Sequence, residues 1–266
     1  MKRTKPARTT SVRPDAPHIL DVAHLGGRGA LYLLALLQAH HSPMRLAPTV
    51  EGTHAVLTVL ATLGLIRVDL PGQSEGYPVV GADKHTWAYT WAHAPLEEVE
   101  GELRQFLLTE ARNPAFAPAW LGVWQELLPQ EIYAYLQHQL RIHHFGDFYL
   151  AGLPSLLEPN DARYSLGHWR YACWATVRSM ASVSLQYPGN VEIVKYTLTS
   201  ELPRRLKLAQ GSYEGKLCFS PSHSLSDSAL TRVFSSVATP LEDQYWIAPP
   251  TLQTMLAVLQ QPERPG

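Results

Sequence analysis

The sequence predicts a mainly α-helical protein, and three observations support this fold class. Apolar residues recur at helical spacing through most of the chain after residue 95. Most prolines of that region fall between the periodic segments, where they end helices instead of interrupting them. The chain has 266 residues, of which 45% are apolar and 17% charged, so it can bury a large core. This composition excludes a wholly disordered protein.

Two helices are predicted near the start of the chain. The first covers residues 29–40, where leucines recur at helical spacing before a Ser-Pro pair ends the pattern. The second covers residues 49–63 and ends at Gly64. Its apolar stripe consists of Thr53, Val56, Leu57, Leu60 and Leu63. We expect this stripe to face the core.

A β-hairpin is predicted directly after the second helix. Residues 65–70 alternate between apolar and charged side chains, residues 71–76 have the composition of a turn, and residues 77–80 form the returning strand. Short strands are also expected at 85–91 and 244–248. The chain therefore combines a small β-element with a larger helical part.

Eight further helices are predicted after residue 95. They cover 96–112, 119–127, 130–143, 148–157, 166–187, 191–209, 227–237 and 251–260. Pro154 and Pro203 lie inside two of these segments, and we expect each to kink or end its helix. Trp120, Trp124, Trp169, Cys173 and Val177 stand at helical spacing and are expected in the core.

The first two helices and the hairpin together resemble a winged helix-turn-helix domain. The resemblance covers about residues 19–80 and rests on the order of elements and on the ending Leu60-Ala61-Thr62-Leu63-Gly64-Leu65-Ile66. It implies that the second helix lies in the major groove of DNA. The fold expected is thus an N-terminal winged helix with a small β-hairpin, followed by a helical C-terminal domain. We expect a flexible basic arm at 1–17, a winged-helix-like domain at 18–82 and a helical domain at 83–266.

The expected DNA-binding residues come from the arm, the second helix and the hairpin. The outward face of the second helix holds Glu51, His54, Ala55, Thr58 and Thr62, and none of these is lysine or arginine. The positive charge that neutralises the DNA phosphates must therefore come from lysine and arginine residues outside this helix face. The segment 1–14 contains five lysine and arginine residues and no acidic residue. Basic N-terminal arms of this kind can enter the minor groove of DNA. The expected set is Lys2, Arg3, Lys5, Arg8, Arg13, Arg45, Thr49, His54, Thr58 and Arg67.

The sequence thus predicts a non-enzymatic DNA-binding protein, either a transcriptional regulator or a DNA-associated factor. We expect it to bind double-stranded DNA as a homodimer, because paired half-sites strengthen a weak single contact. The C-terminal helices would serve dimerisation or effector sensing. The alternative is a protein-interaction scaffold in which the winged helix binds another protein. The low charge, the seven tryptophans and the uncharged helix face suit that alternative.

Other candidate sites are weaker. His138, His143, His144 and Asp147 could hold a metal for a hydrolase, but solvated histidines are the favoured interpretation. Arg163, Arg170, Arg178, Lys195, Arg204, Arg205 and Lys207 are basic, and the last three could form a second phosphate-contacting patch. A solvated helix surface is the favoured interpretation of this group. No nucleotide-binding or nucleophile motif occurs, so no catalytic residue, cofactor or metal is expected.

Two features bear on the cellular setting. No window approaches the ~18 apolar residues of a membrane span, so we expect no membrane partner and a cytoplasmic location. Cys173 and Cys218 have no zinc-binding spacing, and both are expected to be buried free thiols.

Overall fold

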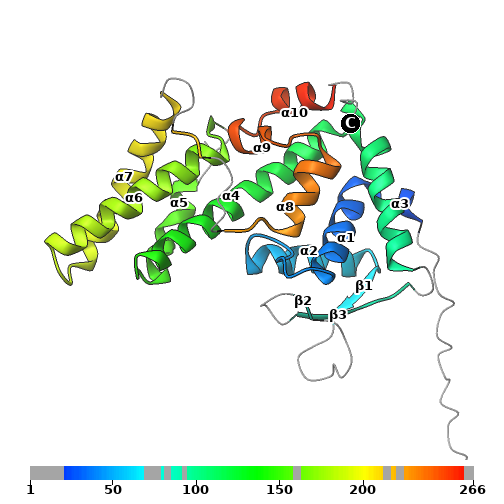
Figure 1. Cartoon of the computed structure of the whole chain (residues 1–266), viewed down its shortest axis with the longest axis horizontal. Helices are drawn as coiled ribbons and strands as arrows, with labels where there is room; N and C mark the ends of the chain where they lie inside the picture. The colour runs from blue at the N-terminus through cyan, green and yellow to red at the C-terminus, as the bar shows by residue number, and fades with distance from the viewer. Residues whose placement is uncertain are drawn as a thin grey trace, which may run out of the picture.

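The computed structural model describes residues 21–68, 79–80, 85–91, 95–157, 163–211, 217–219 and 225–260. The chain is mainly helical with a small antiparallel sheet, as expected (Figure 1). The N-terminal elements are η1 (Val22–Leu25), α1 (Gly26–His40), α2 (Val50–Thr62), β1 (Ile66–Val68), β2 (Val79–Val80) and β3 (His85–Tyr89). No helix of the described residues is long and apolar enough to cross a membrane.

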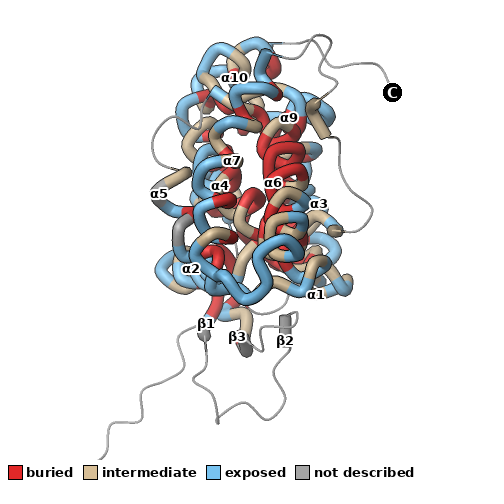
Figure 2. The backbone as a smooth tube through the Cα atoms, turned by 90° about the vertical axis from the view of Figure 1, so that its left-hand side faces the viewer, coloured by how far each residue is buried: buried red, intermediate tan, exposed pale blue. Residues whose placement is uncertain are grey.

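The remaining elements are helical. They are α3 (Leu96–Thr109), η2 (Glu110–Arg112), η3 (Pro114–Phe116), α4 (Ala117–Ile142), η4 (Asp147–Gly152), α5 (Leu153–Leu157), α6 (Leu166–Gln186), α7 (Val191–Gln210), α8 (Ala229–Val233), η7 (Phe234–Ala238), α9 (Gln244–Ile247) and α10 (Leu252–Leu259). α6 and α7 lie side by side and project at the left of Figure 1. Buried residues run along much of α6 (Figure 2).

Helix α1 lies at the centre of one half of the core. Every residue from Ala30 to Leu37 is buried, because α1 packs against α2, α3 and α8. The backbone N–H groups of Ala229 and Leu230, at the start of α8, donate to the carbonyls of Arg45 and Leu46 at 2.8 and 2.9 Å. One hydrophobic cluster extends from the N-terminal helices to α10. The packing is therefore continuous across the expected boundary at residue 82.

The sheet differs from the predicted hairpin. Its strand order is β1-β3-β2, and both pairings are antiparallel, with Val68 opposite Trp87 and Val80 opposite His85. The strand expected at 85–91 is confirmed, and it lies between the two strands that were predicted to pair with each other. Trp87, in the middle of the central strand β3, is fully buried, so this strand is also the one that packs against the core.

Helix α4 corrects the prediction of two helices at 119–127 and 130–143. It continues through Pro129, which removes one backbone donor but leaves the flanking turns intact. Leu127 and Leu128 before the proline, and Ile132 after it, are buried against the core. This burial outweighs the loss of one hydrogen bond. Likewise Pro203 does not end α7, whereas Pro154 lies in the first turn of α5, where proline is tolerated.

Two segments of the C-terminal part differ from the predicted elements, and the predicted core residues are largely confirmed. The segment 244–248 is helix α9 and not a strand, since the N–H groups of Ile247 and Ala248 donate to the carbonyls of Asp243 and Gln244. The helix predicted at 227–237 is α8 followed by a π-helical turn. The tryptophans, Cys173 and Val177 expected in the core are buried. Both cysteines are free thiols, but Cys218 is only partly buried.

Candidate functional site

Helix α2 presents one buried and one exposed face, as its sequence pattern predicts. Thr49 caps the helix, because its hydroxyl oxygen accepts a hydrogen bond from the backbone N–H of Gly52 at 3.0 Å. Most of the predicted apolar stripe is buried, but Leu63 is 44% exposed and leaves the stripe one residue short. The predicted outward residues, Glu51, His54, Ala55, Thr58 and Thr62, are all exposed. The polar face is therefore open to solvent from the first turn to the last.

The threonine hydroxyls on this face are oriented by the helix itself. The hydroxyl of Thr58 donates to the carbonyl of His54, and that of Thr62 donates to the carbonyl of Thr58, each at 2.8 Å. A hydroxyl has one hydrogen and two lone pairs, so both side chains offer acceptors to a ligand. Amino groups on base edges in the major groove are donors of the matching kind.

The expected basic residues lie in three places. Lys2, Arg3, Lys5, Arg8 and Arg13 lie outside the described residues. Arg45, in the segment that leads into α2, is partly buried and donates from Nη1 to the carbonyl of Pro48 at 3.2 Å. Arg67 lies on β1, directly after α2, and is exposed. Within the described residues, the structure thus brings Thr49, His54 and Thr58 onto one helix with one arginine before it and one after it.

The segment between α1 and α2 sets the position of α2. Residues 41–49 contain no helix. They are fixed from outside, because the first two N–H groups of α8 donate to the carbonyls of Arg45 and Leu46. The N–H groups at the start of a helix have no acceptor within the helix, so these bonds give partners to the donors of α8 and to the carbonyl groups of the segment before α2. The start of α2 is therefore tied to the C-terminal half of the chain.

The candidate metal cluster is not assembled. Helix α4 ends at Ile142, so His143 and Asp147 do not share a helix, and His144 has a positive φ of 58°. Asp147 accepts hydrogen bonds from Arg141 Nη2 at 3.0 Å and Gln137 Nε2 at 2.9 Å. These contacts lower the pKa of Asp147. Among the described residues, no three histidine, cysteine or acidic side chains are close enough to hold a metal ion.

The candidate basic patch on α7 is largely paired. Glu201 accepts from Arg204 Nε at 2.9 Å and from Arg205 Nε at 3.1 Å. The bond to Arg204 is the main cause of the lowered pKa of Glu201, and the charges of both arginines add to it. The two guanidinium groups share one carboxylate, which reduces the positive charge they present to a phosphate. This arrangement fits a solvated helix surface.

Sequence reasoning missed a buried ion pair between α6 and α4. Arg170 and Glu131 are 1% and 3% exposed, and Arg170 Nη2 lies 3.3 Å from Glu131 Oε2. The guanidinium lies over the rings of Trp246 and Tyr135, at 4.2 and 5.2 Å from their centres. Burial raises the pKa of Glu131, and the charge of Arg170 opposes that shift. Arg170 precedes Cys173 and Val177 by three and seven residues, a spacing that places it on their buried face.

A second carboxylate oxygen completes this cluster. Oε1 of Glu131 accepts from the hydroxyl of Thr231 at 2.5 Å, and Thr231 in turn lies in the first turn of α8. The cluster therefore connects α4, α6 and α8. The interpretation of Arg170 as part of a solvated surface is wrong, because its side chain is buried among the rings of Trp246 and Tyr135 and the carboxylate of Glu131.

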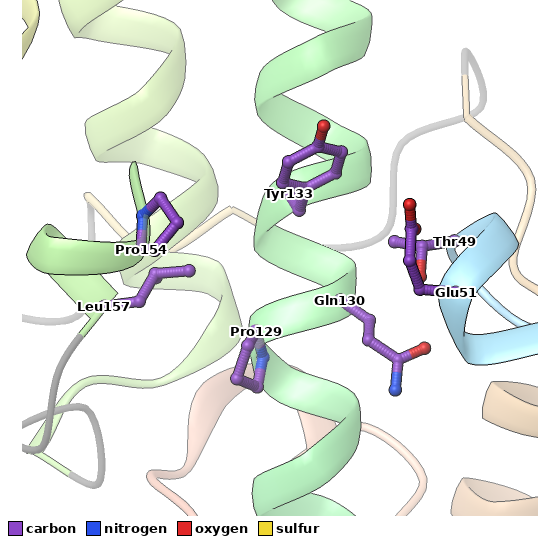
Figure 3. A pocket seen from close by; sticks show the side chains of 7 residues that line it. All are labelled: Thr49, Glu51, Pro129, Gln130, Tyr133, Pro154 and Leu157. Carbon is purple, nitrogen blue, oxygen red and sulfur yellow. The ribbon is translucent and has the colours of Figure 1, made fainter. Parts of the chain in front are cut away.

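A groove lies beside the first turn of α2, and sequence reasoning also missed it. Its volume is about 450 Å³. Helix α4 forms its floor, with α2 on one side and α5 on the other (Figure 3). The lining residues are Thr49, Glu51, Pro129, Gln130, Tyr133, Pro154 and Leu157. They come from three distant parts of the sequence, so no local motif could indicate the groove.

No protein-family model, curated protein or solved structure matches the chain.

Proposed function

We propose that the protein binds double-stranded DNA through the exposed face of α2, with β1 and β3 as the strands of a wing. In this proposal it is a non-enzymatic transcriptional regulator or DNA-associated factor that acts as a homodimer. The observation that carries the proposal is that α2 has a fully open polar face while its other face is held by the core. In helix-turn-helix proteins, a helix with an exposed polar face lies in the major groove.

The chemistry of α2 suits contact with bases more than contact with phosphates. Thr58 and Thr62 offer acceptors, His54 adds a ring with polar nitrogens, and the methyl group of Ala55 can touch a thymine methyl. None of the residues of α2 is lysine or arginine. Affinity for the phosphates would then depend on Arg67 and on the five lysine and arginine residues of segment 1–14.

The test is fluorescence anisotropy with duplex DNA of random sequence at two salt concentrations. We expect binding that weakens steeply with salt. Replacing the five basic residues of segment 1–14 with glutamine removes up to five phosphate contacts, and should flatten the slope of log affinity against log salt by up to about 4.5. Absence of binding at protein concentrations up to ~10⁻⁴ M would overturn the proposal.

A matched pair of variants tests the role of α2. Thr58→Glu places a negative charge on the exposed face, and we expect it to weaken duplex binding by about tenfold or more through repulsion of phosphates. Thr199→Glu is the control, because Thr199 is also exposed, lies on α7, and donates its hydroxyl hydrogen to a backbone carbonyl of its own helix. Equal losses in the two variants would show that α2 is not the contact.

A protein-interaction scaffold is the second candidate, favoured by exposed apolar side chains on the α6–α7 pair. Leu185 is 82% exposed and Tyr196 is 70% exposed. Tyr187 and Val191, at the connection between the two helices, are exposed as well, and a group of exposed apolar side chains is typical of surfaces that bind protein. The discriminating result would be a stoichiometric protein partner whose binding is lost on Leu185→Ser and Tyr196→Ser, together with no binding of DNA.

A further inference from the structure

The groove between α2, α4 and α5 has the size and lining of a small-molecule site. Its volume of about 450 Å³ lies within the range of known ligand pockets. Pro129 and Tyr133 lie on the floor, and Pro154 and Leu157 form the wall from α5 (Figure 3). Most of the lining is therefore apolar, which favours a ligand with an apolar body.

The polar groups of the groove indicate the charge of that ligand. Glu51 supplies a carboxylate at the α2 side, and none of the described lining residues is basic. Nε2 of Gln130 is engaged, because it donates to the carbonyl of Glu126 at 3.0 Å, whereas Oε1 is buried against Gly52 without a hydrogen-bond partner and is a further acceptor. The ring of Tyr133 can attract a cation. An acid, an aromatic ring and an apolar floor together match an amphipathic cation.

We propose that this groove binds a small apolar amine, with its protonated nitrogen at Glu51 and its apolar body over Pro129, Tyr133 and Leu157. Thr49 and Glu51 belong to the start of α2, so the bound amine bridges α2 to α4 and α5. It thereby restrains the helix that we propose to contact DNA. This regulatory consequence rests on the proposed function, whereas the binding of the amine does not.

Calorimetric titration with three probes of similar shape tests the binding. Naphthylmethylamine is cationic, naphthylmethanol is neutral and naphthylacetate is anionic. We expect affinity to fall in that order, because the carboxylate attracts the first probe and repels the third. Failure of the amine to bind, or equal affinity for the amine and the acid, would overturn the proposal.

Two pairs of variants locate the site. Glu51→Gln should weaken the binding of naphthylmethylamine by about two- to fivefold, which is the effect of losing an exposed ion pair. The affinity for naphthylmethanol should stay unchanged. Its control is Glu97→Gln, since Glu97 is also an exposed acid at the second position of its helix. Leu157→Trp should fill the groove and weaken the binding of both probes, whereas Leu252→Trp, at a position 44% exposed on α10, should leave it unchanged. Equal effects within a pair would show that the amine binds elsewhere.

The DNA experiment is kept separate. Calorimetry with the full chain needs no DNA, so amine binding without duplex binding would overturn the proposed function and leave the site intact. Where both occur, the amine should change the affinity for duplex DNA in the original chain and have a smaller effect in Glu51→Gln. An unchanged affinity for DNA at saturating amine would overturn the regulatory consequence alone.

Discussion

Helices α1 and α2 follow each other in the sequence and have opposite surroundings. α1 is buried on all sides from Ala30 to Leu37, whereas α2 is buried on one face only. The sequence pattern explains the difference, because α1 has apolar residues around its whole circumference and α2 has them on a stripe. A helix without a polar face must be enclosed by other elements, and here α3 and α8 enclose it. A helix with a polar face can cover the core and still meet a ligand.

The comparison also shows how the two halves of the chain depend on each other. α8 covers α1 and donates two backbone hydrogen bonds to the segment before α2. Removing these contacts would expose α1 and release the start of α2 together. Stability should therefore be concentrated at α1 and its cover, and the outward face of α2 should carry little of it.

The largest effect is expected from Leu34→Ala in α1. Leu34 is fully buried, so the truncation should lower the free energy of unfolding by about 2–5 kcal/mol. Thr58→Ala on the exposed face of α2 should change it by less than about 0.5 kcal/mol. Denaturant unfolding of both variants measures the difference. Similar losses in the two would contradict the contrast between the helices.

A smaller loss is expected from Ser228→Ala, at the start of α8. The hydroxyl oxygen of Ser228 accepts from the N–H of Thr231 at 3.1 Å and is buried. Loss of this cap should cost about 1–2 kcal/mol in thermal or denaturant unfolding. Ser236→Ala is the control, since Ser236 is exposed and its hydroxyl donates to the carbonyl of Arg232 instead of accepting from an N–H group at the start of a helix. If Ser236→Ala costs as much, the cap does not account for the loss.

Glycine substitutions compare the crowding of α2 with that of a free helix surface. A Cβ at Gly101 of α3 meets nothing within 4 Å, so Gly101→Ala should stabilise the protein by about 0.5–1 kcal/mol. A Cβ at Gly52 of α2 would lie 1.8 Å from Oε1 of Gln130, so that side chain must move. Gly52→Ala should therefore not show the increase in stability that we expect for Gly101→Ala. Equal melting temperatures for the two variants would show that α2 and α4 are not in close contact there.

The smallest effect concerns pH and His40, at the end of α1. Burial lowers the pKa of His40, and the neighbouring His41 adds to the shift. The unfolded chain then binds a proton at His40 more tightly than the folded chain does. The free energy of unfolding is therefore at its full value above about pH 6.5, where His40 is neutral in both states, and it decreases as the pH falls. His138 and His168 shift in the same direction. His40→Gln should reduce the acid sensitivity of unfolding in part, and an unchanged slope would contradict this assignment.

Local periodicity was sufficient to predict most helices and both faces of α2. The outward residues of α2 are exposed because their spacing alone decides which side meets solvent. Leu63 departs from the pattern, since it lies at the C-terminus of α2, just after its last turn, where the helical periodicity no longer applies.

Several other errors came from interactions between distant residues. β3 pairs with β1 and β2, which lie before it in the sequence, and α4 continues through Pro129 with Leu128 and Ile132 packed in the core. The groove and the Arg170–Glu131 pair each join elements far apart in sequence. Propensity and spacing describe one segment at a time and contain no information on such partners.

The bonds between α8 and the segment before α2 also affect how the chain behaves during synthesis. Ala229 reaches its partner Arg45 only after roughly 180 further residues have been added, which takes on the order of ten to forty seconds at ribosomal speed. Until then the leucines of α1 lack their cover on the growing chain. A nascent chain of this length should therefore be a target for chaperones that hold exposed apolar segments.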